Sequence, residues 1–213
     1  PKKLKIYFVD KLEAPQSQIR AGYVTDLIYS PTGDYFKSYL MNYTLGGAFN
    51  SRINLNLRED KGWTYGARSY FSASDEPGSF SVYSGVLAEA TDSAVYEIIQ
   101  EIRDYRERGI TDDELQFMKN SIGQREVRDY ETPRQKSSFL RRIVHYDLGK
   151  SFIDDQSKLI ASITKEELNA LAKKYLDLNQ FYVVIVGDGV GNLAPLKNLG
   201  YELIELNADG KQK

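Results

Sequence analysis

The chain has 213 residues, of which 28 are Lys or Arg and 30 are Asp or Glu, so the formal net charge is −2. With 41% hydrophobic and 12% aromatic residues, it has enough apolar surface for one large domain or two small ones, which excludes a disordered or purely fibrous protein. There is no excess of positive charge for nucleic-acid binding and no apolar run near the roughly 20 residues that span a bilayer. We therefore expect a soluble protein with no nucleic-acid partner and no membrane span.

Two residue counts limit the possible chemistry. The chain contains 0 Cys and 1 His. These counts exclude disulfides, thiol nucleophiles and any zinc motif that needs two histidines on one helix. We expect no metal and no cofactor to be bound by this chain alone. Absent cysteines fit a bacterial periplasm as well as a cytoplasm, so the compartment stays open.

The first part of the chain predicts two strands followed by two helices. These elements are strands at 6–9 and 18–24, a helix at about 33–45, and a short helix with Phe49, Ile53 and Leu57 on one buried stripe. Gly46 and Gly47 can end the first helix in a left-handed turn, and Gly62 stops the second. The three glycines are candidates for supporting the loops around a site.

Residues 63–86 give the clearest structural pattern. From Trp63 to Asp75, the residues at odd positions are mostly apolar and those at even positions are mostly polar, as in a strand. The same alternation resumes at Phe80, after a turn at Glu76-Pro77-Gly78. The segment therefore predicts a long β-hairpin.

The rest of the chain is dominated by helices. The expected elements are a helix at 95–105 ended by Gly109, a helix opened by a capping box at Thr111, a helix from Pro133 to Leu148 with Phe139, Leu140, Ile143 and Tyr146 facing inward, a helix opened by a second capping box at Thr164, a buried strand at 183–186, one helical turn and a last strand at 201–206. This order predicts an α+β fold, a two-layer domain with one mostly antiparallel sheet and helices on one face. We expect residues 1–213 to form a single domain.

Two tempting site signals have simpler interpretations. His145 lies opposite the apolar stripe of its helix, so a surface histidine is favoured over the base of a catalytic triad. The series Gly187-x-Gly-x-Gly191 follows a strand but comes near the end of the chain, without the strand-helix-strand context of a dinucleotide site. A loop is the better interpretation there.

The segment 45–66 is the strongest functional candidate. Arg58 lies in the last turn of the short helix, and Tyr65 lies at the start of the next strand, with Gly62 allowing a sharp return between them. A guanidinium and a phenol that reach one place can hold a peptide carbonyl or stabilise an oxyanion. The alternative, which spacing alone favours, is that Arg58 complements a helix C-terminus and Tyr65 is a core residue.

This segment resembles the pitrilysin/insulinase family of zinc metallopeptidases, which includes the mitochondrial processing peptidase. The residues that carry the resemblance are Leu45-Gly46-Gly47-Ala48-Phe49-Asn50-Ser51-Arg52-Ile53-Asn54 and Leu57-Arg58-Glu59-Asp60-Lys61-Gly62-Trp63-Thr64-Tyr65, with further agreement at 5–9, 15–19, the Thr111 helix and the strand at 183–187. The match is to the C-terminal, metal-free type of domain, so the family fold implies a fragment of a longer protein.

The resemblance implies a function for the chain as half of a zinc metalloendopeptidase. Family members pair homologous domains around a substrate chamber, and the metal-free half contributes an arginine and a tyrosine seven residues apart. Arg58 and Tyr65 match that pair. The resemblance thus implies that Zn²⁺ is held by a homologous partner domain, on the same polypeptide or a separate subunit, that a peptide is the substrate, and that this domain alone is inactive.

Two other functions stay open. A non-catalytic relative acting as a scaffold or partner subunit would share the same domain, and an intact H-x-x-E-H motif in the neighbouring domain would distinguish the peptidase from it. A free-standing ligand-binding α+β module would require the chain to be complete as given.

Overall fold

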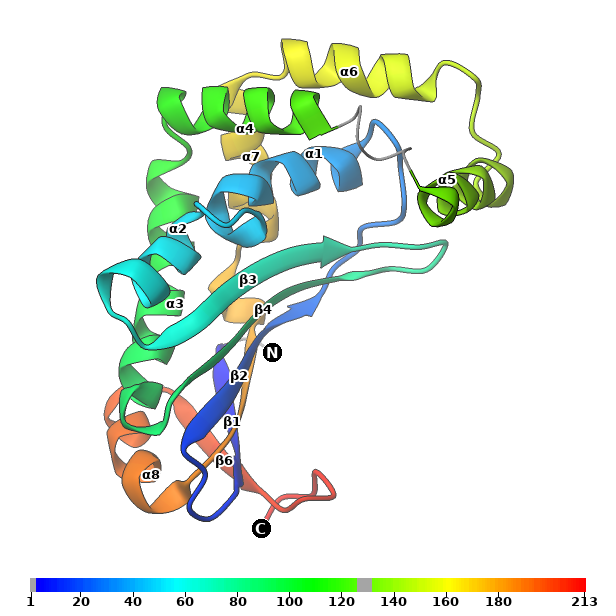
Figure 1. Ribbon diagram of the computed structural model, residues 1–213. Coiled ribbons are helices and arrows are strands. Elements are labelled where there is room, and N and C mark those ends of the chain that lie inside the picture. The colour runs from blue at the N-terminus through cyan, green and yellow to red at the C-terminus, as the bar shows by residue number, and fades with distance from the viewer. Residues whose placement is uncertain (1–2, 126–131) are drawn as a thin grey trace.

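The computed structural model describes residues 3–125 and 132–213 and has an α+β architecture (Figure 1). Its strands are β1 (Lys5–Asp10), β2 (Gln16–Val24), β3 (Thr64–Ser72), β4 (Ser79–Leu87), β5 (Tyr182–Gly187) and β6 (Glu202–Leu206). They form one sheet in the order β3-β4-β2-β5-β1-β6. Neighbouring strands are antiparallel from β3 to β5, whereas β1 runs parallel to both β5 and β6. The expected sheet is confirmed, with the apolar strand β5 in its interior.

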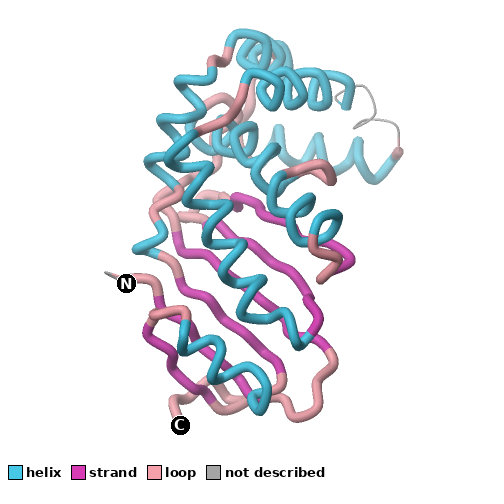
Figure 2. The backbone as a smooth tube through the Cα atoms, turned by 90° about the vertical axis from the view of Figure 1, so that its left-hand side faces the viewer, coloured by secondary structure: helices cyan, strands magenta, loops and turns pink. Residues whose placement is uncertain are grey.

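Helices cover one face of the sheet (Figure 2), and one of them, Pro133–His145, stands off the sheet (Figure 1). They are α1 (Asp34–Asn42), α2 (Arg52–Asn54), α3 (Thr91–Arg108), α4 (Asp112–Arg125), α5 (Pro133–His145), α6 (Phe152–Ser162), α7 (Lys165–Tyr175) and α8 (Gly189–Asn198). α1 and α2 continue directly as π-helical turns, η1 (Tyr43–Gly47) and η2 (Leu55–Asp60). Short 3-10 turns precede α3 and β5 at Ala88–Ala90 and Leu178–Gln180.

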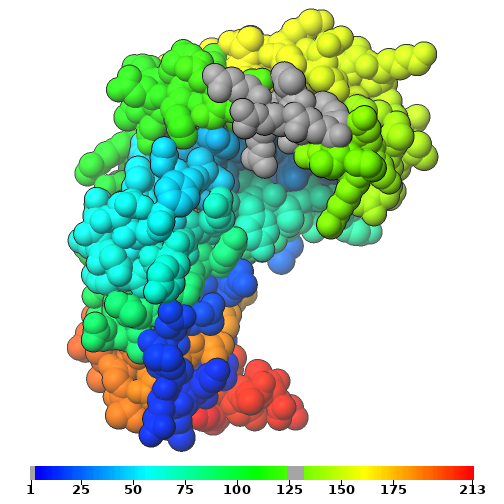
Figure 3. All heavy atoms as spheres, in the orientation of Figure 1, coloured from blue at the N-terminus to red at the C-terminus, as the bar shows by residue number. Residues whose placement is uncertain are grey.

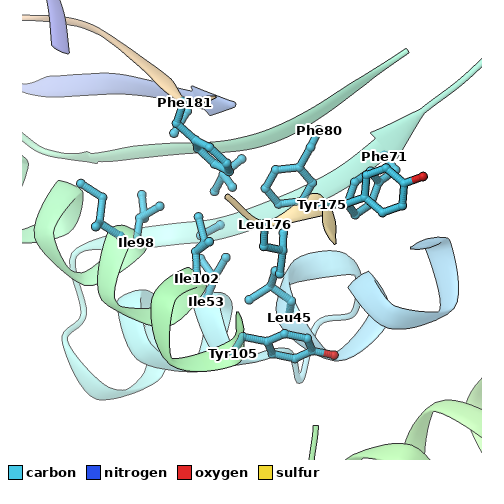
Figure 4. Packing of buried hydrophobic residues seen from close by; sticks show 14 of the residues in the cluster. Leu45, Ile53, Phe71, Phe80, Ile98, Ile102, Tyr105, Tyr175, Leu176 and Phe181 are labelled. Atoms are coloured by element: carbon cyan, nitrogen blue, oxygen red, sulfur yellow. The ribbon is translucent and has the colours of Figure 1, made fainter. Parts of the chain in front are cut away.

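The core lies between the sheet and these helices (Figure 4). Alternate strand residues such as Phe80 and Ile185 are fully buried, and α3 presents its apolar stripe, including Ile98 and Ile102, to them. Tyr105, also on α3, is fully buried and donates its phenol to the carbonyl of Met41 at 2.7 Å. Burial raises the pKa of this phenol, so the hydroxyl stays protonated and can serve as a donor inside the core.

Both predicted capping boxes are present. The Glu114 carboxylate accepts from the Thr111 backbone N–H while the Thr111 hydroxyl accepts from the Glu114 N–H, and Thr164 and Glu167 repeat the arrangement. Each box satisfies N–H groups that a helix start leaves without intrahelical partners.

The expectation for the helix at 133–148 is confirmed only in part, since Phe139, Ile143 and Tyr146 are half-buried and the Phe139 ring stacks on Phe152 with ring centres 5.6 Å apart. α5 ends at His145 and has no buried residue, and the side chain of Leu140, expected inside, is 59% exposed. The apolar stripe is real in the sequence, but α5 stands at the tip of the β3-β4 hairpin and not on the sheet (Figure 1). α6, which follows it, was not expected from the sequence.

The short helix also differs from its expected stripe. Ile53 and Leu57 are fully buried, but Phe49 precedes α2 and is 52% exposed. The prediction from residues spaced four apart therefore placed the start of the helix about one turn too early in the chain.

The glycine series at the end of β5 has more structure around it than expected. Gly189 opens α8, a ten-residue helix in place of one turn, and β5, α8 and β6 form a strand-helix-strand unit in which both strands flank β1. The context expected to be missing is therefore present. The Asp10 carboxylate accepts from the Gly189 N–H at 2.9 Å, so a side chain of the chain itself already caps this helix start. The interpretation as a loop is therefore wrong, because Gly189 and Gly191 lie in the first turn of α8.

In the space-filling view the outline is hollowed on its right side, between α5 above and the C-terminal residues below (Figure 3). The helices that cover the sheet lie on the other side of the strands in the same orientation (Figure 1). The hollow therefore borders the face of the sheet that none of the described helices covers.

Candidate functional site

The turn between η2 and β3 brings the ends of the two elements together through backbone hydrogen bonds. The Arg58 carbonyl accepts from the Gly62 N–H at 3.2 Å, and the Leu57 carbonyl accepts from the Trp63 N–H at 3.0 Å. Gly62 has φ +68°, a left-handed conformation that a residue with a Cβ adopts only with strain. Gly62 thus supports the return between Arg58 and Tyr65 as the sequence predicts.

Tyr65 sits on a β-bulge at the start of β3. Thr64 pairs with Val86 and Ala67 pairs with Ser84, so two residues of β3 face Gly85 alone. The extra residue interrupts the alternation of the hairpin and re-aims the side chain. The side chain of Tyr65 therefore does not lie on the buried face of β3 with Ala67. It is 92% exposed, so the interpretation of Tyr65 as a core residue is wrong.

Hydrogen bonds hold this bulge in shape. The Thr64 hydroxyl donates to the Gly85 carbonyl at 2.7 Å and accepts from the Gly66 N–H at 3.0 Å, and the Ser84 hydroxyl donates to Thr64 Oγ1 at 3.0 Å. Asn54, which is 2% exposed, accepts from the Ala67 N–H at 2.9 Å and donates to the Phe49 carbonyl at 2.7 Å. The backbone on both sides of Tyr65 is thereby fixed to α2 and to β4.

The outer edge of β3 is occupied by another side chain as well. Asn42 is buried and donates its Nδ2 to the Ser69 carbonyl at 2.8 Å, while its Oδ1 accepts from the Ser69 hydroxyl. Edge strands expose N–H and C=O groups that can pair with another chain. Asn42 and Asn54 use such groups on β3, so the edge next to Tyr65 is closed to strand addition at Ala67 and Ser69.

Gly46 and Gly47 support this packing in a way that differs from their expected role. Neither has a positive φ, so they do not end α1 in a left-handed turn. A Cβ on Gly46 would overlap the side chain of Ser69, and one on Gly47 would lie 3.1 Å from the Asn42 carbonyl oxygen. Gly46 instead lets η1 approach β3 closely, and Gly47 lets the chain pass close to Asn42 at the end of α1.

Arg58 is partly exposed on the last turn of η2. Its guanidinium carbon lies 4.5 Å from the centre of the Phe49 ring, and its Nη1 lies 3.0 Å from Glu59 Oε1 in an ion pair. The Nη1 atom is buried and makes no aligned hydrogen bond. Arg58 and Tyr65 lie on either side of the Gly62 turn. The guanidinium keeps donor capacity that its own neighbours do not use.

Arg52, six residues earlier, shows what a purely structural arginine looks like here. Its Nε and Nη2 donate to the two carboxylate oxygens of Glu114 at 2.5 and 2.6 Å, and Nη2 also donates to the Gly109 carbonyl at 2.9 Å. Partial burial acts to raise the pKa of Glu114, but the hydrogen bonds from Arg52 and Thr111 outweigh it and hold this pKa below its usual range. Arg52 is committed to the fold, whereas Arg58 is not.

Sequence reasoning missed the residues that position the site. Asn42, Asn54, Thr64 and Ser84 fix the bulge and the edge of β3, yet only Asn54 and Thr64 lie inside the motif quoted above. Their signal was a polar side chain within an otherwise apolar pattern, because a buried amide or hydroxyl needs partners. Nothing in the sequence alone identified those partners.

Within residues 3–125 and 132–213, no group of three or more His, Asp or Glu side chains is arranged to hold a metal ion. His145 lies far along the chain from the site, and its Nε2 is 2.9 Å from Asp75 Oδ2 at the surface. The donor set therefore does not fit a catalytic zinc, and no step of the chemistry can be assigned to a metal on this chain. Among the described helices, none has the length and apolar character that a membrane crossing requires.

The fold and the site define an α+β domain that presents an arginine and a tyrosine, with no metal-binding cluster in the described part of the chain. Residues 1–122 match the family described as Peptidase M16 inactive domain. Because this match covers more than half of the chain, the chain belongs to that family, and the resemblance found in the sequence is confirmed.

The relatives of the chain are zinc proteases by name. An uncharacterized zinc protease of Streptomyces coelicolor is 30% identical over 144 residues, which are 64% of this chain and 30% of the relative. An uncharacterized zinc protease of Bacillus subtilis is 27% identical over 136 residues, which are 63% of this chain and 33% of the relative. The matched residues thus span about a third of the length of these curated relatives.

Solved structures agree on the fold. A peptidase M16 inactive domain from Pseudomonas fluorescens has a TM-score of 0.78 at 23% identity, covering 88% of this chain and 44% of that one. An inactive peptidase domain from Bordetella parapertussis has a TM-score of 0.65 at 13% identity, covering 81% of this chain and 92% of that one. The chain is therefore an inactive M16 domain, with an accessory role in a peptidase family.

Proposed function

We propose that this domain is the substrate-holding half of a zinc metalloendopeptidase and that Arg58 and Tyr65 contact the peptide. The observation that carries the proposal is the exposure of Tyr65, 92%, on a bulge that hydrogen bonds hold rigid. An exposed aromatic side chain gains nothing from core burial, whereas a fixed backbone beneath it favours a binding role. The exposed phenol O–H and the Arg58 guanidinium are two donors on one turn.

In this proposal the chemistry of the chain is limited to binding and charge stabilisation. The guanidinium of Arg58 and the hydroxyl of Tyr65 donate to the carbonyl oxygen of the substrate, which becomes negatively charged as the peptide bond is attacked. The zinc, its histidines and the water-activating glutamate lie on a homologous partner domain. Because this chain offers one histidine and no metal-binding cluster among its described residues, it needs that domain for turnover.

The test uses the complete peptidase, in which this domain is paired with a zinc-bearing one. Tyr65→Phe removes one donor and no packing volume, and losing a single oxyanion donor typically lowers kcat by about 10²- to 10³-fold. Tyr182→Phe is the matched control because Tyr182 is 41% exposed on the same sheet, away from the turn. Arg58→Lys should also lower activity, since an ammonium does not reproduce a planar two-pronged contact.

The second candidate is a non-catalytic scaffold or partner subunit. It is favoured by the ion pair between Arg58 and Glu59, which gives the guanidinium a structural partner. If Tyr65→Phe and Arg58→Lys both leave the kinetics unchanged while the partner domain still binds, the scaffold is correct and the substrate contact is wrong.

A further inference from the structure

The three strands at one end of the sheet have an open face with an unusual charge pattern. β2, β3 and β4 have nine residues each, contain no Asp or Glu, and carry only two charged side chains, Arg20 and Arg68. Both arginines are exposed. The buried side chains of these strands belong to the core on the opposite face, which is the face that the helices cover (Figure 2). This end of the open face is therefore cationic.

The two arginines share one row across the sheet. Tyr83 on β4 is the partner of Arg68 on one side and of Arg20 on the other, and residues directly opposite each other present their side chains on the same face. The guanidinium carbon of Arg20 lies 4.7 Å from the centre of the Tyr83 ring, which confirms this arrangement. Two strand spacings of about 4.8 Å place the Cα atoms of the arginines about 10 Å apart.

Neither arginine has a carboxylate partner among residues 3–125 and 132–213. Arg20 contacts the Tyr83 ring, and Arg68 makes a long hydrogen bond of 3.4 Å from Nη1 to the Gly47 carbonyl. At the other end of the same sheet, Lys5 and Glu202 neutralise each other at 2.9 Å. The positive charge of the open face is thus concentrated at the end that carries the bulge.

Tyr65 lies on this same face. The bulge sets Tyr65 opposite Gly85, whose strand neighbours on that face include Tyr83. Gly85 has no side chain, so the surface beside the Tyr65 ring is left open. Arg68 follows Tyr65 by three positions, and at about 3.3 Å per residue, shortened by the bulge, the two side chains stand about 7 to 10 Å apart along the strand.

We propose that Arg20 and Arg68 form a subsite for an acidic side chain of the peptide whose carbonyl Tyr65 contacts. The inference rests on the proposed function and adds a substrate class to it, peptides with Glu or Asp near the scissile bond. An extended peptide spans about 3.3 Å per residue, so the acidic residue lies two or three residues from the bond held at Tyr65. A guanidinium binds a carboxylate through paired, charge-assisted hydrogen bonds, and two guanidiniums without carboxylate partners favour such a ligand.

The experiment measures binding, which needs no catalysis. Fluorescein-labelled peptides of Ala and Ser, each with one Glu at a successive position and each matched by the Gln peptide, are titrated with the complete protein and followed by fluorescence anisotropy. We expect Glu to be preferred over Gln by about 2- to 5-fold at one or two adjacent positions, the size that exposed charge pairs give. Raising the ionic strength from about 0.1 M to about 1 M shortens the screening length from about 10 Å to about 3 Å and should remove the preference.

Variants assign the preference to the two arginines. The double variant Arg20→Gln/Arg68→Gln should bind the Glu and Gln peptides equally, and Arg20→Lys/Arg68→Lys should retain part of the preference because it keeps the charge. Arg108→Gln is the matched control, since Arg108 is exposed on α3 and pairs with Asp104 there. Gln retains much of the side-chain length of Arg, so we expect the variants to fold. Circular dichroism of each variant checks that the sheet is intact.

Three results would overturn the proposal. The first is equal affinity for the Glu and Gln peptides, and the second is a Glu preference that survives in the double Gln variant. The third is a different occupant, shown either by tighter binding of a single-stranded oligonucleotide or by self-association that the double variant abolishes. If Tyr65→Phe leaves turnover unchanged while the Glu preference holds, the proposed function fails and the acidic subsite stands.

Discussion

The turn that carries Arg58 and Tyr65 and the helix α5 both present exposed side chains, but their support differs. Beneath Tyr65, backbone groups are tied by Asn54 and Thr64 to α2 and β4. α5 has no buried side chain. Its contacts include stacking of Tyr146 on Tyr29, with ring centres 3.8 Å apart, and an exposed ion pair at its last residue. Exposure on a fixed backbone indicates a positioned functional group, whereas exposure along a helix with no fully buried residue does not.

The largest change in the free energy of unfolding should come from substituting Asn42, which helps to hold β3 beside the site. Asn42 is 3% exposed, and its amide bonds the carbonyl and the hydroxyl of Ser69. Asn42→Ala leaves both of these buried groups without a partner. Because orphaned buried polar groups cost about 1–3 kcal/mol, we expect the free energy of unfolding to fall by about 3 kcal/mol, measured by urea denaturation. Asn198→Ala, at an exposed position of α8, is the control. Equal stability of the two variants would show that the edge of β3 does not depend on this amide.

A smaller effect, local to the site, is expected from Asn54. Asn54→Ala removes the acceptor of the Ala67 N–H, so we expect a loss of about 1–2 kcal/mol and faster hydrogen exchange at that amide. Turnover of the complete peptidase should fall as well, although Asn54 lies beneath the surface and touches no substrate in the proposed complex. Unchanged exchange at Ala67 would mean that the bulge is held by Thr64 alone.

Much of the fold could be predicted from the sequence. In these parts of the chain, the local sequence pattern and the burial of the side chains favour the same structure. β5 is a continuous apolar run and lies inside the sheet, and the capping boxes at Thr111 and Thr164 open helices as expected. In these elements the residue pattern, the local hydrogen bonds and the tertiary packing favour the same structure.

The rest could not be predicted because it depends on contacts between distant residues. The hairpin was expected, but the bulge that turns Tyr65 outward depends on Asn54 reaching the Ala67 N–H across the turn. The apolar stripe of α5 has the right period for a buried helix, but periodicity states only that one face is apolar and not whether another element covers it. Arg58 and Tyr65 were found from the motif, whereas the residues that hold them were found only in the structure.

A pH-dependent effect should distinguish the structural Arg52 from Arg58. The pKa of Glu114 is held below its usual range in the folded protein, so the pair stabilises the fold above the ordinary carboxyl pKa. This contribution is lost as the pH falls from the ordinary carboxyl pKa through the lowered pKa of the folded protein. For a pair that is about one-fifth exposed we expect about 1 kcal/mol, seen as the pH-dependent difference in unfolding free energy between wild type and Glu114→Gln. A difference that does not change with pH would show that Arg52 holds Glu114 by geometry alone.

The smallest effect is expected on α5. Val144 is 81% exposed and Leu140 is 59% exposed, so truncating either to Ala removes little buried surface and should change the free energy of unfolding by less than about 0.5 kcal/mol. Ile102→Ala provides the scale, since it empties a fully buried position and should cost about 3 kcal/mol. Hydrogen exchange should also be faster along α5 than along α3, because α5 has no buried side chain to protect its opening. A loss above about 1 kcal/mol for Leu140→Ala would mean that the apolar stripe is covered in solution, as its periodicity alone predicts.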